Sequence, residues 1–220
     1  MLTRRIPCLL MVFGLALSPL FAADPPKYPF AKPPLELLDD LAKADLGKVP
    51  TPTEAERKLI AGVWERKAKS PAERLELSDD DLVELMLFAS GTSDPAERKK
   101  YRDKIADLRA EVGKKLVEMK STADRGEVLV KAVHERAMMS GYEAKQTSLT
   151  AVFDTGKQNC VSSSALLYLV GKPHGFDLRP MSIPGDRFTD GHAFLDLIDG
   201  KSRLLVETTN PNGFDWETKL

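Results

Sequence analysis

Hydrophobic residues follow a helical spacing through the first half of the chain. Between residues 35 and 120 they recur every three or four positions, which predicts a succession of helices. Several of these helices open with sequences typical of N-terminal caps, at Thr51, Ser70, Ser78 and Asp94. The longest predicted helix covers residues 94–120 and carries one apolar stripe, formed by Tyr101, Ile105, Leu108, Val112, Leu116 and Met119. Such stripes are typical of core packing, so we predict a helical region at 35–120 without chemistry of its own.

Two more helices are predicted, at 123–139 and from Cys160, before the spacing changes to that of strands. A helix that begins at Cys160 is almost continuously apolar, which indicates burial. Its end is expected near Val170 or Gly171, because Pro173 disfavours helical geometry in the residue before it. Three strands are then predicted at 178–183, 192–198 and 203–209. Helices followed by a core helix and an antiparallel sheet predict an α+β protein.

The N-terminal residues 1–23 are typical of a secretory signal peptide. Two arginines precede an apolar run at residues 6–17, and Ala22-Ala23 offers a cleavage site. Because the run is short for a membrane span, we expect an extracytoplasmic protein, periplasmic or secreted, with no stable membrane insertion after signal removal. A retained N-terminal anchor is the alternative. Five prolines within residues 24–34 predict an extended leader.

Composition narrows the function classes. The chain has 32 Lys and Arg against 33 Asp and Glu, and loss of Arg4 and Arg5 with the signal leaves 30 against 33, a net charge of −3. This balance gives no indication of nucleic-acid binding. The sequence contains neither a glycine-rich phosphate loop nor a cluster with metal-ligand spacing, so we expect no cofactor.

Cysteine usage points to a chemical role for one residue. Signal removal takes away Cys8, which leaves Cys160 as the single cysteine of the mature protein. A free thiol in an oxidising compartment is exposed to oxidation and cross-linking, so its presence there calls for a reason. At the N-terminus of a helix, partial positive charge favours thiolate over thiol, which is how a nucleophile is activated. The alternative is a small hydrophobic residue packed in the core.

Three serines follow the cysteine directly after Val161. Ser162, Ser163 and Ser164 fall in the first turns of the predicted helix. Their hydroxyls are suited to the N–H groups that lack an intrahelical acceptor at a helix start. We therefore expect the serines to serve the N-terminal end of this helix.

A cysteine nucleophile needs a base, and the chain has three histidines. His134 lies in the middle of a predicted helix beside Glu135 and Arg136, which predicts a surface position. His174 follows the far end of the cysteine helix. His192, at the start of a predicted strand, is the remaining candidate.

The geometry of a hairpin turn predicts that a carboxylate, Glu207, lies close to His192. If Asp199-Gly200 forms a two-residue hairpin turn, Ile198 lies opposite Lys201 and, further out, His192 lies opposite Glu207. The Cβ atoms of directly paired residues are about 5 Å apart, within reach of a hydrogen bond between carboxylate and imidazole. The alternative is a His–Glu pair that merely lines a half-exposed sheet.

Three short motifs carry a family resemblance. They are Asn159-Cys160-Val161-Ser162 at the start of a helix, Gly191-His192-Ala193-Phe194 on a strand, and Val206-Glu207-Thr208-Thr209 on the next strand. In this order they resemble the transglutaminase-like superfamily, which shares the papain-type cysteine-protease architecture. The resemblance spans roughly residues 124–215 and implies a transglutaminase-like domain at 121–220. The chain ends early for the closed sheet of this superfamily, which would fit a truncated domain.

The resemblance also implies roles for individual residues. Cys160 would be the nucleophile, His192 the general base and acid, and Glu207 would stand where Asp is more common. The oxyanion hole would combine the Cys160 N–H with a side-chain donor, either Gln158 or Asn159. Asn159 is equally suited to cap the helix.

The predicted activity is cysteine-dependent acyl transfer. Such an enzyme would hydrolyse or exchange amide bonds of a peptide or protein substrate through a thioester on Cys160. One alternative is a catalytically inactive transglutaminase-like module that binds peptides or proteins. Another is a structural or assembly protein whose helical part carries the function. Neither the substrate nor the oligomeric state is indicated by the sequence.

Overall fold

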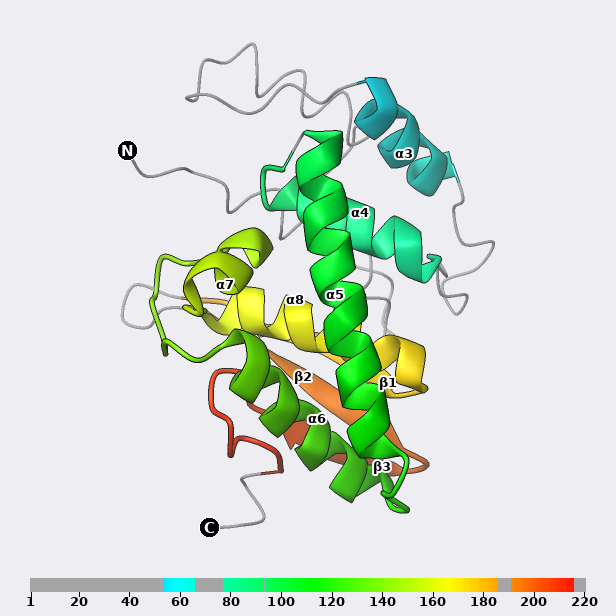
Figure 1. Ribbon diagram of the computed structural model, residues 1–220. Coiled ribbons are helices and arrows are strands. Elements are labelled where there is room, and N and C mark those ends of the chain that lie inside the picture. Colours follow the sequence, from blue (N-terminus) through cyan, green and yellow to red (C-terminus); the bar gives the residue numbers. More distant parts are fainter. Residues whose placement is uncertain (1–53, 66–76, 93, 186–190, 216–220) are drawn as a thin grey trace. The chain divides into compact units, whose positions relative to one another are not determined.

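The computed structural model describes residues 54–65, 77–92, 94–185 and 191–215 (Figure 1). The predicted signal peptide at 1–23, the leader at 24–34 and the predicted caps at Thr51 and Ser70 lie outside these residues. The chain divides into two compact units, residues 1–94 and residues 95–220.

The described part of the first unit contains two helices in contact, α3 (Glu54–Glu65) and α4 (Asp79–Ala89). Helix α4 starts where predicted, because the Ser78 hydroxyl accepts a hydrogen bond of 3.1 Å from the Asp81 N–H. Gly91 follows the helix with φ at +84°, a left-handed conformation that glycine adopts without strain. Both ends of α4 are therefore set by local sequence.

In the second unit, four helices precede the sheet, and α8 is the central one. They are α5 (Pro95–Leu116), α6 (Thr122–Ala137), α7 (Leu149–Thr155) and α8 (Cys160–Gly171). Helix α8 contacts the other three helices and also the sheet (Figure 1). Ten of its 12 residues are buried, as its continuous apolar sequence predicts. The stripe predicted along α5 is buried from Tyr101 to Leu116, where the helix ends four residues earlier than predicted.

The sheet consists of three antiparallel strands in the order β1-β2-β3. They are β1 (Asp177–Ile183), β2 (His192–Asp199) and β3 (Ser202–Val206). Helix α8 packs on β1 and β2. The described residues thus form a mixed α+β fold, with helices followed by a small antiparallel sheet, as predicted.

The predicted register of the β2–β3 hairpin is wrong by two residues. Asp199 pairs with Ser202, so the turn is Gly200-Lys201 and not Asp199-Gly200. Gly200 has φ at +61°, which is what the first position of a type II′ turn requires. Since side chains alternate faces with a period of two, a slip of two residues leaves every side chain on its predicted face. His192 and Glu207 therefore share a face without being directly paired.

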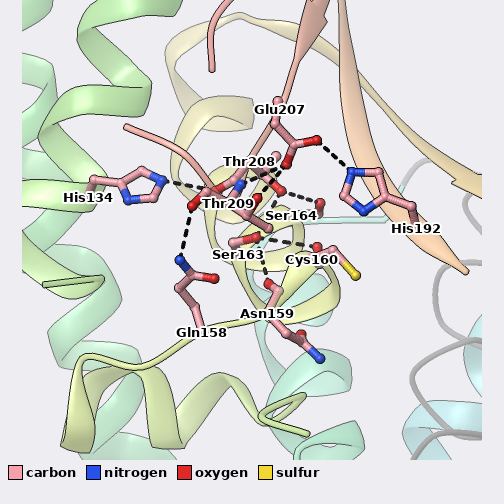
Figure 2. Close-up of polar contacts among 10 residues, drawn as sticks. All are labelled: His134, Gln158, Asn159, Cys160, Ser163, Ser164, His192, Glu207, Thr208 and Thr209. Carbon is pink, nitrogen blue, oxygen red and sulfur yellow. Dashed lines mark hydrogen bonds and ion pairs between the residues drawn. The ribbon is translucent and has the colours of Figure 1, made fainter. Parts of the chain in front are cut away.

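Strand β3 ends at Val206, three residues before the predicted end. The chain then turns through Asn210 and returns, so that the Glu207 N–H donates to the Gly213 carbonyl at 3.0 Å and Val206 bridges Phe214. A Cβ atom at position 213 would lie 2.2 Å from the Glu207 carbonyl oxygen, so only glycine fits there. This return places Glu207, Thr208 and Thr209, here named the acid segment, beside the start of α8 (Figure 2).

Candidate active site

Cys160 is the first residue of α8, as predicted. The Asn159 side chain caps the helix by accepting hydrogen bonds of 3.0 Å from the N–H groups of Val161 and Ser162. In return, the Ser162 hydroxyl accepts the Asn159 N–H at 3.0 Å, which completes a capping box. Cys160 is a free cysteine with 8% of its surface exposed. The helix start, and with it the position of the thiol, is therefore fixed by its own local sequence.

The three serines after Val161 do not all serve the helix start, and for two of them the prediction is wrong. Only Ser162 takes part in capping. Ser163 and Ser164 instead form hydrogen bonds of 2.8 Å with the hydroxyl of Thr208. Because the Asn159 side chain already accepts the N–H groups of Val161 and Ser162, Ser163 and Ser164 are not needed for capping and can bond the acid segment packed against them.

His192 and Glu207 are in contact, as the sequence predicts. The His192 Nε2 atom lies 2.6 Å from a Glu207 carboxylate oxygen, Oε2. The other oxygen, Oε1, accepts hydrogen bonds from the Thr209 N–H at 3.0 Å and the Thr209 hydroxyl at 2.7 Å. Both oxygens of the carboxylate are thus held, and the His192 ring also stacks on Phe194 with centroids 6.0 Å apart. Glu207 is therefore fixed in an orientation in which it can orient the imidazole.

The second ring nitrogen of His192, Nδ1, is directed away from Glu207 (Figure 2). The Cys160 sulfur lies on the same side of α8 as His192, and Figure 2 draws no hydrogen bond between these two side chains. The His192 side chain keeps 38% of its surface exposed and that of Glu207 keeps 23%. This arrangement leaves one imidazole nitrogen available for proton transfer while the other is held by a carboxylate.

His134 is not a surface residue, and the prediction for it is wrong. It is buried, and its Nε2 atom lies 2.9 Å from the Thr208 carbonyl oxygen. Burial lowers the pKa of His134, and the bond to the Thr208 carbonyl opposes this effect in part. The charged neighbours Glu135 and Arg136 are exposed, but adjacent helical residues point about 100° apart. Polar neighbours in sequence therefore do not place a helical residue on the surface.

His174 lies beyond the far end of α8, as predicted. It belongs to the short 3-10 helix η1 (Lys172–His174), and its Nε2 atom contacts the Arg109 carbonyl oxygen at 3.0 Å. Its ring packs against Gly113 of α5, where a Cβ atom would lie 2.9 Å from the ring. This histidine lies at the opposite end of α8 from Cys160.

The two candidate oxyanion donors both bind main-chain carbonyl groups. Gln158 is 1% exposed and donates to the Thr209 carbonyl at 3.2 Å. Asn159 donates from Nδ2 to the Ala144 carbonyl at 3.0 Å, in addition to capping α8. A side-chain amide carries two N–H bonds, so one bond to a carbonyl leaves a second hydrogen on each group. The structure thus gives both residues a structural role and leaves the choice between them open.

Thr208 is the residue of this site that sequence reasoning missed. It is fully buried, its hydroxyl bonds two serines of α8, and its carbonyl bonds His134 (Figure 2). One signal was present in the sequence: three consecutive serines in an otherwise apolar helix need polar partners from elsewhere in the chain. That signal indicates that a partner exists but not which residue it is.

Comparison with known proteins does not assign the chain to a family. No protein-family model matches the sequence, and no curated protein matches it. Within residues 54–65, 77–92, 94–185 and 191–215, no group of three or more His, Cys, Asp or Glu side chains is placed to hold a metal ion. No helix in these same ranges is long and apolar enough to cross a membrane.

Proposed function

We propose that this protein is an exported, transglutaminase-like enzyme of papain-type architecture that cleaves amide bonds of peptides or proteins through a thioester on Cys160. The observation that carries the proposal is the 2.6 Å contact between His192 and Glu207 beside the helix that begins with the single cysteine of the described residues. Nucleophile, base and orienting acid are the three groups that thiol-dependent acyl transfer requires.

The reaction begins with proton transfer from the Cys160 thiol to Nδ1 of His192. The thiolate adds to the carbonyl carbon of the substrate amide, and the C–N bond breaks as the leaving amine takes the proton from His192. Water then adds to the thioester and gives a proton to His192. The C–S bond breaks, the acid product leaves, and the thiolate regains the proton.

Glu207 serves the imidazole in both steps. Its carboxylate accepts the Nε2 hydrogen of His192, which keeps Nδ1 free to receive a proton. Once Nδ1 is protonated, the same carboxylate stabilises the imidazolium. Thr209 holds the carboxylate by two hydrogen bonds, so little reorganisation is needed during the reaction.

The start of α8 supplies the charge stabilisation. As the first helical residue, Cys160 has a backbone N–H without an intrahelical acceptor. This N–H, together with the positive end of the helix, favours the negative oxygen of a tetrahedral intermediate. Gln158 or Asn159 would add the second donor.

A second candidate function is a catalytically inactive module that binds peptide or protein. The burial of Cys160 favours it, because a buried thiol commonly packs as a small hydrophobic residue. In that case His192 and Glu207 would form a stable polar pair with no proton to transfer.

Alkylation by iodoacetamide distinguishes the two functions. The rate at Cys160 is measured at pH 6 and pH 9 in the wild type and in His192→Ala, with the modified peptide identified by mass spectrometry. An ordinary thiol is almost wholly protonated at pH 6, so the proposal predicts rapid labelling of the wild type and a large loss in His192→Ala. Labelling at pH 9 reports access to the thiol in both proteins. Equal rates at pH 6 would contradict the enzyme and favour the binding module.

A further inference from the structure

We infer that Thr208 is a positioning residue of the proposed thiol chemistry: its buried hydroxyl fixes the acid segment to the first turns of α8 and orients the peptide unit that precedes Cys160. The inference rests on the proposed function, because it concerns how the same reacting groups are held. It assigns a role to a residue that neither donates nor accepts a proton in the reaction itself.

The Thr208 hydroxyl lies between two serines of the nucleophile helix. Its Oγ1 atom is 2.8 Å from the Oγ atom of Ser163 and 2.8 Å from that of Ser164. All three residues have no exposed surface. Buried hydroxyls without solvent access must satisfy one another, so these two bonds join the acid segment to α8.

The direction of the hydrogen bonds follows from the number of hydrogens. Ser163 Oγ lies 2.7 Å from the Asn159 carbonyl, which can only accept, so Ser163 donates there. Ser163 must then accept from Thr208. Because Thr208 has a single hydroxyl hydrogen, it accepts from Ser164. The chain of bonds therefore runs from Ser164 through Thr208 and Ser163 to the Asn159 carbonyl.

This chain ends on the peptide unit of the proposed oxyanion hole. The Asn159 carbonyl and the Cys160 N–H belong to one planar peptide unit, so fixing the carbonyl also fixes the direction of the N–H. The same carbonyl accepts the Ser163 N–H at 2.9 Å. Successive hydrogen bonds polarise one another, which strengthens the dipole of that unit.

The main chain of Thr208 is held as well. Its carbonyl accepts the Nε2 hydrogen of His134, and its neighbours Glu207 and Thr209 bond each other. Removal of the hydroxyl would leave the His134 bond and the bond from Gln158 to the Thr209 carbonyl, but it would break both serine bonds between the acid segment and α8. The His192–Glu207 pair would then be held less firmly relative to Cys160.

The test compares alkylation of Cys160 at pH 6 and pH 9 in variants of the full chain. Thr208→Val keeps the shape but removes the hydroxyl and both of its bonds, and we expect the ratio of the pH 6 rate to the pH 9 rate to fall about tenfold, within the range for a buried polar group that loses its partner. Thr208→Ser retains the hydroxyl and should stay within about twofold of the wild type.

Tyr101→Phe is the matched control for lost stability. It removes the hydroxyl of a buried tyrosine that bonds Asp154 between α5 and α7, in the same compact unit but in neither the acid segment nor α8. We expect this variant to melt at a lower temperature with an unchanged ratio of rates. A purely structural role of Thr208 would give the same result in Thr208→Val.

Two further variants make every outcome decisive. Ser163→Ala breaks the same chain from the α8 side and replaces Thr208→Val if that variant lacks a native near-ultraviolet circular dichroism spectrum. A native-like ratio in the folded variant, with a lowered ratio in His192→Ala, would overturn the inference and leave the proposed function standing. An unchanged ratio in His192→Ala would overturn the proposed function and the inference together.

Discussion

His134 and His192 contact the acid segment from opposite sides, and their surroundings differ (Figure 2). His134 is buried and bonds a main-chain carbonyl, which can only accept a hydrogen. His192 is part exposed and bonds a carboxylate, which can also stabilise a positive ring. Two histidines that contact the same segment thus differ in burial and in the kind of group they bond.

The difference follows from what each partner does when the ring gains a proton. A neutral carbonyl gives a buried imidazolium little compensation for lost hydration, so His134 is held neutral and acts as a hydrogen-bond donor. A carboxylate compensates the charge, and partial exposure adds water. We therefore expect substitutions near His192 to affect reactivity and substitutions of His134 to affect stability.

The largest expected effect is that of Glu207→Gln. The amide preserves the size of the side chain but cannot stabilise the imidazolium or impose its tautomer, so amide turnover should fall about 10³- to 10⁴-fold. The measurement is hydrolysis of a peptide panel, combined with thermal unfolding to verify the fold. Cys160→Ala sets the zero level of turnover.

Glu135→Gln is the matched control for this prediction. Glu135 is an exposed carboxylate on α6 that pairs with Lys115. Its neutralisation should leave turnover unchanged. A Glu207→Gln variant that retains more than about a tenth of wild-type turnover would show that the acid does not orient the base.

An effect of intermediate size is expected in His134→Gln, where the dependence of stability on pH should change. Burial lowers the pKa of this residue in the folded state, so below about pH 6.5 the unfolded chain binds a proton that the folded protein does not. Stability should therefore fall as the pH decreases from 7 towards 5. In His134→Gln, which keeps an N–H donor but does not titrate, this part of the decrease should be absent.

Urea unfolding at pH 7 and pH 5 measures this difference between the two proteins. The pH 6 alkylation rate of Cys160 serves as the second readout and should be the same in both. An equal pH dependence of stability would mean that His134 takes up its proton in the folded protein. Slower alkylation of Cys160 in His134→Gln would contradict the expectation that His134 affects stability and not reactivity.

The smallest expected effect is that of Thr209→Val. The variant removes one of the two hydrogen bonds on Oε1 of Glu207 and keeps the main-chain bond. One such bond contributes about 1 kcal/mol, so turnover should fall about fivefold, and Thr209→Ser should restore it. The readout is kcat/KM on the best peptide of the panel. A loss as large as that of Glu207→Gln would indicate that the carboxylate has moved away from His192.

Local features of this fold were predictable from the sequence. Helix α8 ends at Gly171, as predicted, but Lys172 before Pro173 keeps helical angles, with φ at −51° and ψ at −47°, so the steric reason expected there is wrong. Ser78 and Asn159 cap helices through bonds to residues two or three positions ahead. The meeting of His192 and Glu207 was predicted for a similar reason, since a short hairpin joins their strands. Its register was wrong by two residues, yet the alternation of side chains kept both on one face.

The sequence by itself indicated the order and approximate positions of these helices and strands, and it brought His192 and Glu207 together, because caps, periodicity and hairpin alternation act over a few residues. The tertiary structure alone decided that His134 is buried and that Ser163 and Ser164 bond Thr208, more than 40 positions away. A buried polar group needs a partner, but its identity depends on how distant segments pack. Chain packing thus selected the acid segment as the partner of α8.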